Sequence, residues 1–435
     1  MLDWIRSLSI VDGPLFAGSF ATLAGAVLIL LLPAPGLTAS RSWFYLRVGA
    51  LGAFGAGLGM LLTWLLSDVF DIFGVSLTWV VRVADILAFT AIAIAFANLL
   101  GTAVWRKILA VLTVALAGWG LFLAINVDFG QYPTVGDALG TTYLEPADLP
   151  AVDPSAPELA GWTTPDDRDL PGRGQVGQVV IPATSSGFAA RPAYVYLPPA
   201  ALAPNPPRLP VVIALPGQPG EPADLFRAAK LDVLLDELAQ EHNGVAPILV
   251  VPDQLADPAL NPMCIDSALG NSATYLTQDV PDWIRTHLNV AADRTAWTIA
   301  GFSQGGTCAI QLGAGHPELF GSLIDVSGER VPSLGSEKET VIRGFGGDMA
   351  AYLAATPEGL LAAHAPYLDT AAVFAVGARD EKYSASMQAV STAAVGAGMR
   401  VTRESSPGTA HDWNTARFGF RLGFTALLTR WGISG

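Results

Sequence analysis

The chain has 435 residues, of which 51% are apolar and only 14% are charged. Soluble globular domains usually carry about 25% charged residues, so this composition excludes intrinsic disorder as the main state and argues against a protein built only of soluble domains. The net charge of −14 belongs entirely to the part beyond residue 128, because residues 1–128 hold six basic and six acidic residues. Such an acidic part repels phosphate backbones, so we expect no nucleic acid partner.

Four long apolar runs follow one another in residues 1–128. Each has 18 to 24 residues and is almost free of charge, which is enough to cross a hydrocarbon core of about 30 Å. A secretory signal peptide is an alternative for the first run, but three more runs follow it. We therefore predict a four-helix transmembrane region over residues 1–128. The predicted spans are Leu15–Leu32, Phe44–Leu66, Leu77–Leu100 and Ile108–Ile125.

Two features inside the spans have structural interpretations. Arg82 and Asp85 are three residues apart, so we expect them to pair on one face of the third helix. Small residues recur at four-residue spacing in the second span, which predicts a face where helices approach closely. These small residues are Gly49, Ala53 and Gly57.

The basic residues of the short loops predict the orientation in the membrane. The first and third loops carry all the loop Lys and Arg residues, whereas the second loop carries only acids, so loops one and three are expected to be cytoplasmic. Both chain ends, and with them residues 129–435, are then extracytoplasmic. The bases are Arg41, Arg47, Arg106 and Lys107, and the acids are Asp68 and Asp71.

Residues 129–173 are rich in Pro, Gly and Asp, which predicts a linker and arm with little regular structure. From residue 174 the pattern changes to strands and helices. Residues Gly174–Pro198 read as a β-hairpin with a Ser-Ser-Gly turn. Short apolar runs then alternate with helical patterns, which predicts an α/β domain with a mostly parallel sheet over residues 174–435. The predicted strands are Leu209–Leu215, Ala246–Val251, Thr295–Ala300, Ser322–Val326 and a last strand Ala371–Val376; the predicted helices are 222–241, Ala273–Leu288, Thr307–Ala314 and Asn414–Leu428.

A G-x-S-x-G motif, GFSQG, lies between a predicted strand and a predicted helix, with Ser303 at its centre. This context is typical of the nucleophile elbow of α/β-hydrolases, where a sharp turn requires small residues two positions before and after the serine. An ordinary N-cap serine is the alternative. A serine hydroxyl needs a base, and the order serine, acid, histidine favours His411, which follows the last predicted strand.

Three carboxylates compete for the role of the acid that orients His411. Asp380 directly follows the last predicted strand and is the preferred candidate. Its neighbour Glu381 is the main alternative, and Asp325, at the end of the preceding strand, is a weaker one.

Two backbone N–H groups must form the oxyanion hole. One is expected from Gln304, and the other from the loop after strand Leu209–Leu215, where Gln218 is the preferred donor and Gly217 the second. The two cysteines, Cys264 and Cys308, are expected to form a disulfide on an oxidising side of the membrane. Two cysteines cannot complete a structural zinc site, and no cofactor motif occurs, so we expect no metal and no cofactor.

With these residues in hand, Gly174–Gly435 resembles the esterase branch of the α/β-hydrolases, which includes esterase D and the actinobacterial mycolyltransferases. The motifs that carry the resemblance are VYLPP, LPG, GFSQGG and HDW. The resemblance implies acyl-serine chemistry, and the four-span N-terminus is similar to that of membrane-tethered actinobacterial esterase-like proteins. The mycolyltransferases are usually secreted and use Glu as the acid, whereas Asp380 is favoured here. This difference favours a hydrolase.

The sequence thus predicts a membrane-anchored, extracytoplasmic serine esterase that acts on a lipid or glycolipid ester of the cell envelope. An acyltransferase, in which a sugar hydroxyl replaces water, is the first alternative, and a non-enzymatic envelope scaffold is the second. The segment Val331–Leu368, inserted between two strands, is expected to form a lid or pocket wall.

Overall fold

A computed structural model describes residues 2–33, 40–70, 77–100, 102–139, 146–163 and 170–433. The chain divides into two compact units, Met1–Thr142 and Tyr143–Gly435, and each is described by itself.

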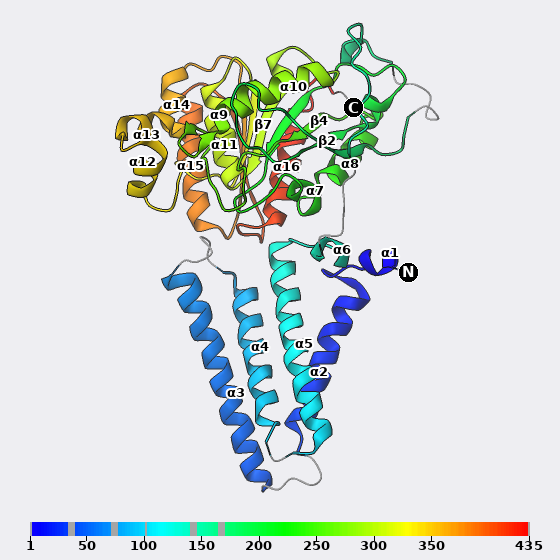
Figure 1. Cartoon of the computed structure of the whole chain (residues 1–435), viewed down its shortest axis with the longest axis vertical. Helices are drawn as coiled ribbons and strands as arrows, with labels where there is room; N and C mark the ends of the chain where they lie inside the picture. The colour runs from blue at the N-terminus through cyan, green and yellow to red at the C-terminus, as the bar shows by residue number, and fades with distance from the viewer. Residues whose placement is uncertain are drawn as a thin grey trace. The chain divides into compact units, whose positions relative to one another are not determined.

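In the first unit, each predicted apolar run forms one long helix, and the helices lie side by side (Figure 1). All four helices are long and apolar enough to cross a membrane. The helices are α2 (Gly13–Leu31), α3 (Arg41–Trp64, continued by the π-helical turn η1, Leu65–Val69), α4 (Trp79–Ala97) and α5 (Val104–Phe129). Two short helices, α1 (Leu2–Arg6) and α6 (Val135–Ala138), meet at one end of the bundle, where Ser9 and Thr134 form a β-bridge.

The prediction of which small residues of α3 pack closely against a neighbouring helix is wrong. Gly49, Ala53 and Gly57 are exposed, and a Cβ atom on either of these glycines would meet nothing within 4 Å. The small residues buried against α4 are a different set on the same helix: Gly52, Gly55 and Gly59. Gly55 and Gly59 have the same four-residue spacing as the predicted set, and only the approach of α4 decides which face is packed.

The predicted Arg82–Asp85 pair is also wrong. Arg82 instead donates to both carboxylate oxygens of Asp68 at the end of α3, at 2.6 and 2.7 Å. Asp85 accepts a hydrogen bond of 2.5 Å from Thr63, also on α3. The neighbouring helix thus supplies partners for both charges, which a pattern within one helix does not reveal. Asp71 lies outside the described residues.

Arg106 is part of α5 rather than of a loop and is only 1% exposed. Its guanidinium donates to the Asn98 side chain at 2.7 Å and to the Leu30 carbonyl at 2.9 Å. Arg106 therefore links α5 to Leu30 of α2 and to Asn98 at the end of α4. Lys107, the next residue, is exposed.

The second unit is built on an eight-stranded sheet with the order β1-β2-β4-β3-β7-β8-β9-β10. The β1–β2 and β2–β4 pairs are antiparallel and all the others are parallel, as predicted. The strands are β1 (Gln175–Val179), β2 (Ala193–Leu197), β3 (Val211–Leu215), β4 (Ile248–Val251), β7 (Trp297–Phe302), β8 (Ser322–Val326), β9 (Ala371–Gly377) and β10 (Arg400–Ser406). A separate two-stranded ribbon is formed by β5 (Asp266–Ser267) and β6 (Gly270–Asn271).

Helices cover both faces of this sheet, as the alternating pattern predicts. Helices α8 and α16 contact each other, and α11, α14 and α15 form a second contacting group. Their bounds are α8 (Leu231–Glu241), α11 (Gln304–Gly315), α14 (Pro357–His364), α15 (Glu381–Gly396) and α16 (Trp413–Leu427). The inner strands β3, β4, β7 and β8 are buried along their whole length.

Several predicted elements differ in detail. Residues 371–376 are not the last strand, because β10 follows and pairs with β9 in parallel. Its sequence, RVTRESS, is polar since the strand lies exposed at the sheet edge, so no apolar run marks it. The predicted helix 222–241 is split into α7 (Asp224–Arg227) and α8 by Lys230, whose φ is +54°. The predicted helix Ala273–Leu288 becomes α9 (Ser272–Thr274), a π-helical turn at Tyr275–Asp279 and α10 (Val280–His287).

The arm and the insertion both pack on the second unit. The described part of the arm is mostly irregular, as predicted, but it pairs with the domain through β-bridges from Pro146 to Gln178 and from Glu158 to Arg208. The predicted lid segment forms α12 (Glu337–Phe345), α13 (Met349–Ala355) and α14. Residues 331–368 therefore form a helical insertion that lies between β8 and β9 in the sequence, while the two strands pair directly.

Candidate active site

Ser303 occupies a sharp turn between β7 and α11, with φ = +59° and ψ = −121°. Residues other than glycine rarely adopt such a backbone conformation. The strain costs free energy, and residues strained in this way cluster at functional sites. The flanking glycines make the turn possible. A Cβ atom on Gly301 would lie 2.0 Å from the Gly305 carbonyl oxygen, and one on Gly305 would lie 2.2 Å from that of Leu215. The motif therefore requires glycine at both positions, and the Ser303 hydroxyl stands at the carboxyl end of the sheet.

Ser303, His411 and Asp380 form one hydrogen-bonded chain. His411 Nε2 lies 2.8 Å from Ser303 Oγ, and His411 Nδ1 lies 3.0 Å from Asp380 Oδ2. The side chains of His411 and Asp380 are only 11% and 7% exposed, while Ser303 is half-buried and so reachable from solvent. The arrangement can transfer the serine proton to a base whose tautomer the carboxylate fixes.

The loops that carry Asp380 and His411 are bonded to each other. Asp380 follows β9, and His411 follows β10, the neighbouring strand. The backbone N–H of Arg379 donates to the Thr409 carbonyl at 2.9 Å. Asp412 caps α16 by accepting from the Thr415 N–H at 2.9 Å. The parallel pairing of β9 with β10 thus brings the acid and the base together.

Aromatic side chains that we did not predict surround the histidine. The Tyr383 ring centroid lies 4.0 Å from that of His411, and the Phe302 ring stacks on His411 at 5.2 Å. The backbone N–H of Tyr383 also donates to Asp380 Oδ1. Tyr383 lies three residues after Asp380 on α15, so a helix prediction there would have placed it beside the acid. The rings restrict rotation of the imidazole.

The two alternative acids do not contact His411 among the described contacts. Glu381 is exposed at the start of α15. Asp325 lies at the end of β8, where it accepts a hydrogen bond of 2.8 Å from the Gly328 N–H. Its complete burial raises the pKa of Asp325 to about 7. The geometry therefore favours Asp380 as the orienting acid.

The segments expected to form the oxyanion hole meet at Ser303. A Cβ atom on Gly217 would lie 3.2 Å from Ser303 Cβ, so the loop after β3 passes directly beside the nucleophile. Gln218 is the next residue of that loop, and its side chain donates outward to the Pro258 carbonyl. Gln304 begins α11, and the first N–H groups of a helix have no acceptor within it. The N–H of Gln304 and one from the Gly217–Gln218 segment are thus the candidate donors.

A disulfide joins Cys264, in the loop after β4, to Cys308 on α11. Cys308 lies one helical turn beyond Gln304, so the bond ties the start of this helix to the neighbouring loop. Among the described residues, no group of three or more His, Cys, Asp or Glu side chains is placed to hold a metal ion.

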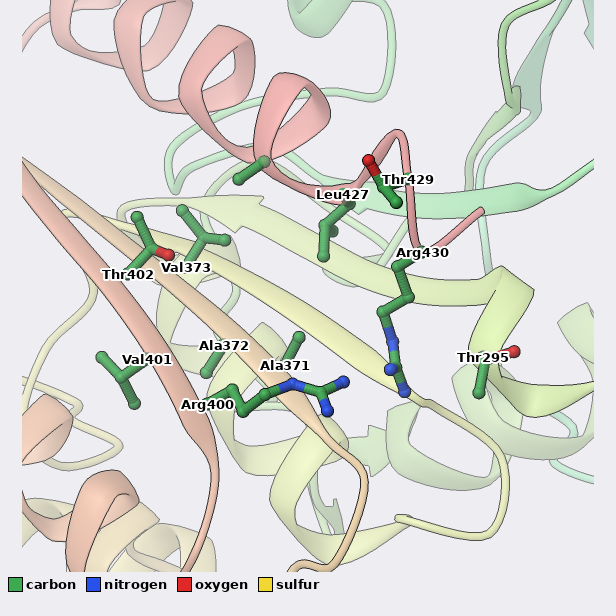
Figure 2. A pocket seen from close by; sticks show the side chains of 11 residues that line it. Thr295, Ala371, Ala372, Val373, Arg400, Val401, Thr402, Leu427, Thr429 and Arg430 are labelled. Carbon is green, nitrogen blue, oxygen red and sulfur yellow. The ribbon is translucent and has the colours of Figure 1, made fainter. Parts of the chain in front are cut away.

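A cavity of about 540 Å³ lies at the opposite end of the sheet, at the start of β9 and β10 (Figure 2). Arg400 and Arg430 extend along it. Both guanidinium groups bind the Asp369 carboxylate, at 2.7 and 2.8 Å. Because Asp380 and His411 lie at the other ends of these strands, this cavity is separate from the candidate active site.

Known proteins resemble this chain, and one relative does so over three quarters of its length. The family model described as "Putative esterase" matches residues 189–404. An uncharacterized protein of Corynebacterium glutamicum is 34% identical over 341 residues, which cover 75% of this chain and 77% of the relative. The aligned 75% of this chain is longer than the second unit, Tyr143–Gly435, so the similarity extends into the first unit. The MPT51 antigen of Mycobacterium leprae is 38% identical over 77 residues, 17% of this chain and 25% of the antigen.

Among solved structures, a ferulic acid esterase superposes with a TM-score of 0.51 at 16% identity, covering 60% of this chain and 99% of that chain. At this level of identity the likeness concerns the fold alone, and it agrees with the α/β-hydrolase fold predicted from the sequence.

Proposed function

Since the chain belongs to the esterase family of the α/β-hydrolases and is a serine ester hydrolase, we propose that it is a membrane-anchored enzyme that hydrolyses an acyl ester of a cell-envelope lipid or glycolipid. The observation that carries the chemistry is the hydrogen-bonded chain from Ser303 through His411 to Asp380. A serine in this contact has both the base that it needs and a strained position that exposes its hydroxyl.

The proposed reaction proceeds in two halves. Ser303 Oγ attacks the ester carbonyl carbon while its proton moves to His411 Nε2, and the N–H donors beside Gly217 and on Gln304 bind the oxyanion of the tetrahedral intermediate. The C–O bond to the alcohol breaks, and His411 returns the proton to that alcohol. Water then attacks the acyl-serine with His411 again as the base, which releases the acid and restores Ser303.

Two observations support a lipid ester at a membrane. The first unit provides four helices that are long and apolar enough to span a bilayer, on the same chain as the esterase unit. The insertion between β8 and β9 exposes large apolar side chains on α12 and α13, at Ile342, Met349 and Leu353. Exposed apolar groups of this kind suit contact with acyl chains.

The proposal places the esterase unit on the extracytoplasmic side. Arg41 and Lys107 are exposed near the ends of α3 and α5 that the positive-inside rule assigns to the cytoplasm, and the buried Arg106 lies at the same end of α5. The β-bridge between Ser9 and Thr134 agrees with an even number of spans, since both residues lie at one end of the bundle. The Cys264–Cys308 disulfide is compatible with an oxidising compartment.

The chemistry is tested with Ser303→Ala in the full chain, purified in detergent. We expect wild-type protein to hydrolyse p-nitrophenyl butyrate and to bind a fluorophosphonate probe covalently, and Ser303→Ala to lose about a thousandfold or more of the rate and all labelling. The control is Ser391→Ala, at a fully buried serine on α15, which should keep both the hydrolysis and the labelling. Wild-type protein that neither hydrolyses the ester nor binds the probe would support the scaffold alternative. Acyl transfer to added trehalose in preference to water would support the acyltransferase.

A further inference from the structure

One buried side chain connects the two segments that are candidates for the oxyanion hole. Gln254, which follows β4, is fully buried. Its amide nitrogen donates to the Pro216 carbonyl at 2.7 Å and to Gln304 Oε1 at 3.0 Å. Pro216 directly precedes Gly217 in the loop beside Ser303, and Gln304 directly follows Ser303.

We propose that Gln254 is a positioning residue that sets the separation and orientation of the two oxyanion-hole N–H groups. This inference rests on the proposed function, since an oxyanion forms only if Ser303 attacks an ester. Gln254 touches neither Ser303 nor His411 in any described contact, so it acts through the loop on one side and through Gln304 on the other.

This position calls for a hydrogen-bond donor. Both partners of Gln254 are acceptor oxygens, and its own Oε1 has no hydrogen-bond partner among the described residues. A buried amide with an unpaired oxygen costs free energy. The side chain therefore serves through its NH₂ group, which a glutamate or an apolar residue cannot replace.

The residue before Gln254 anchors the far end of the same loop. Asp253 is fully buried and binds the Arg191 guanidinium at 2.8 and 2.9 Å. Arg191 in turn donates to the Gly220 carbonyl at 2.9 Å. The segment Asp253–Gln254 thus holds the 216–220 loop at both of its ends, directly through Gln254 and by way of Arg191.

The Gln304 side chain is fixed from its other side as well. Its amide nitrogen donates to Asn261 Oδ1 at 3.0 Å and lies 3.2 Å from Cys308 Sγ. Asn261 and Cys264 belong to one loop, and the disulfide joins that loop to α11. With both ends of its amide bonded, Gln304 cannot rotate freely, which holds the first turn of α11 and its backbone N–H in place.

The role predicts a loss in turnover rather than in substrate binding. Removing one oxyanion-hole donor typically costs about 10²–10³ in kcat, and misplacing the donors costs part of that. For Gln254→Met, which keeps the length of the side chain but has no donor, we therefore expect kcat to fall by about 10- to 100-fold, with KM changed by less than about threefold.

The matched control is Gln311→Met. Gln311 is an equally buried glutamine on α11 whose amide donates to the Ala355 carbonyl and whose Oε1 also has no partner among the described residues. Both variants lose a buried amide, so both are expected to lower the thermal unfolding midpoint of the full chain to a similar degree. Only Gln254→Met should lower kcat, and the pH profile of kcat/KM should keep the wild-type shape, because His411 and Asp380 are untouched.

The measurements are kcat, KM and the rate of fluorophosphonate labelling, with p-nitrophenyl butyrate as substrate. A second variant, Gln304→Met, removes the acceptor for Gln254 and is expected to lower kcat in the same direction, so a Gln254 variant that does not fold leaves the inference testable. The inference would be overturned if Gln254→Met and Gln304→Met both kept the wild-type kcat. It would also be overturned if Gln311→Met lost as much kcat as Gln254→Met. If wild-type protein lacks Ser303-dependent hydrolysis, the proposed function itself has failed, which is a different result.

Discussion

At the scale of single residues, His411 is held by contacts of three kinds. Asp380 accepts from one ring nitrogen, Ser303 bonds the other, and the rings of Tyr383 and Phe302 lie against the imidazole faces. This leaves one orientation in which Nε2 points at the serine. The carboxylate sets the tautomer, while the aromatic rings restrict the rotation of the histidine.

Asp380→Asn is expected to lower kcat by about 10⁴-fold, because an amide at this position favours the wrong histidine tautomer. Glu381→Gln, at the exposed neighbouring position, should leave kcat within about twofold, since surface changes away from a site have small effects. Steady-state hydrolysis of p-nitrophenyl butyrate measures both. Similar small losses in the two variants would show that another carboxylate, such as Asp325, orients His411.

Asp325 gives a pH dependence of stability. Because burial raises the pKa of Asp325 to about 7 from 3.8, the unfolded chain binds fewer protons than the folded chain between about pH 4 and 7. Stability therefore falls as pH rises through that window. Asp325→Asn removes this slope and can still accept from the Gly328 N–H. We expect the thermal unfolding midpoint of the variant, measured relative to that of wild type, to rise from pH 5 to pH 8. If the difference between the two midpoints stays the same at both pH values, the raised pKa is contradicted.

At the scale of elements, close approach of backbones decides where glycine is needed. In the second unit, Gly305 lets α11 begin against the carbonyls at the end of β3. In the first unit, α3 and α4 approach so closely that a Cβ atom on Gly55 would lie 2.5 Å from the Phe89 carbonyl oxygen. A backbone atom cannot move aside as a flexible side chain can.

Gly55→Ala is therefore expected to destabilise the α3–α4 pair by about 1–3 kcal/mol, the usual cost of overpacking. The control is Gly57→Ala on the same helix, where a Cβ atom meets nothing within 4 Å and no loss is expected. The thermal unfolding midpoint in detergent measures the difference. An equal or larger loss in Gly57→Ala would show that the other face of α3 is the packed one.

At the scale of the whole molecule, the disulfide and the sidedness are linked. Cys264 and Cys308 are 44 residues apart, and closing a loop of that length stabilises the folded state by about 3–4 kcal/mol in the chain-entropy model. Structural disulfides form and persist in oxidising compartments, which is where the proposal places the esterase unit.

Replacing both Cys264 and Cys308 by serine is accordingly expected to lower the unfolding free energy of the esterase unit by about 3–4 kcal/mol. A maleimide applied to intact cells should label neither cysteine until a reductant and a denaturant are added. Labelling without a reductant would contradict the bond. Protease added to spheroplasts should cleave the esterase unit, and protection of that unit would contradict the extracytoplasmic orientation.

The sequence by itself determined the features that local pattern controls. Apolar runs of 18 residues or more, almost free of charge, identified the four helices, because a bilayer requires continuous apolar length. Alternating strands and helices identified the parallel sheet, and the spacing of GFSQG with the order of His411 after Asp380 selected three residues that the structure brings into contact.

Only the tertiary structure decided what depends on a neighbouring element. Arg82 pairs with Asp68 on another helix, the packed face of α3 is chosen by α4, and the polar edge strand β10 is a strand because it pairs with β9. The contact of Gln254 with Pro216 and Gln304 likewise joins two loops and the first residue of α11. Such contacts are set by the direction from which two backbones meet, and that direction is not encoded in the periodicity of either segment alone.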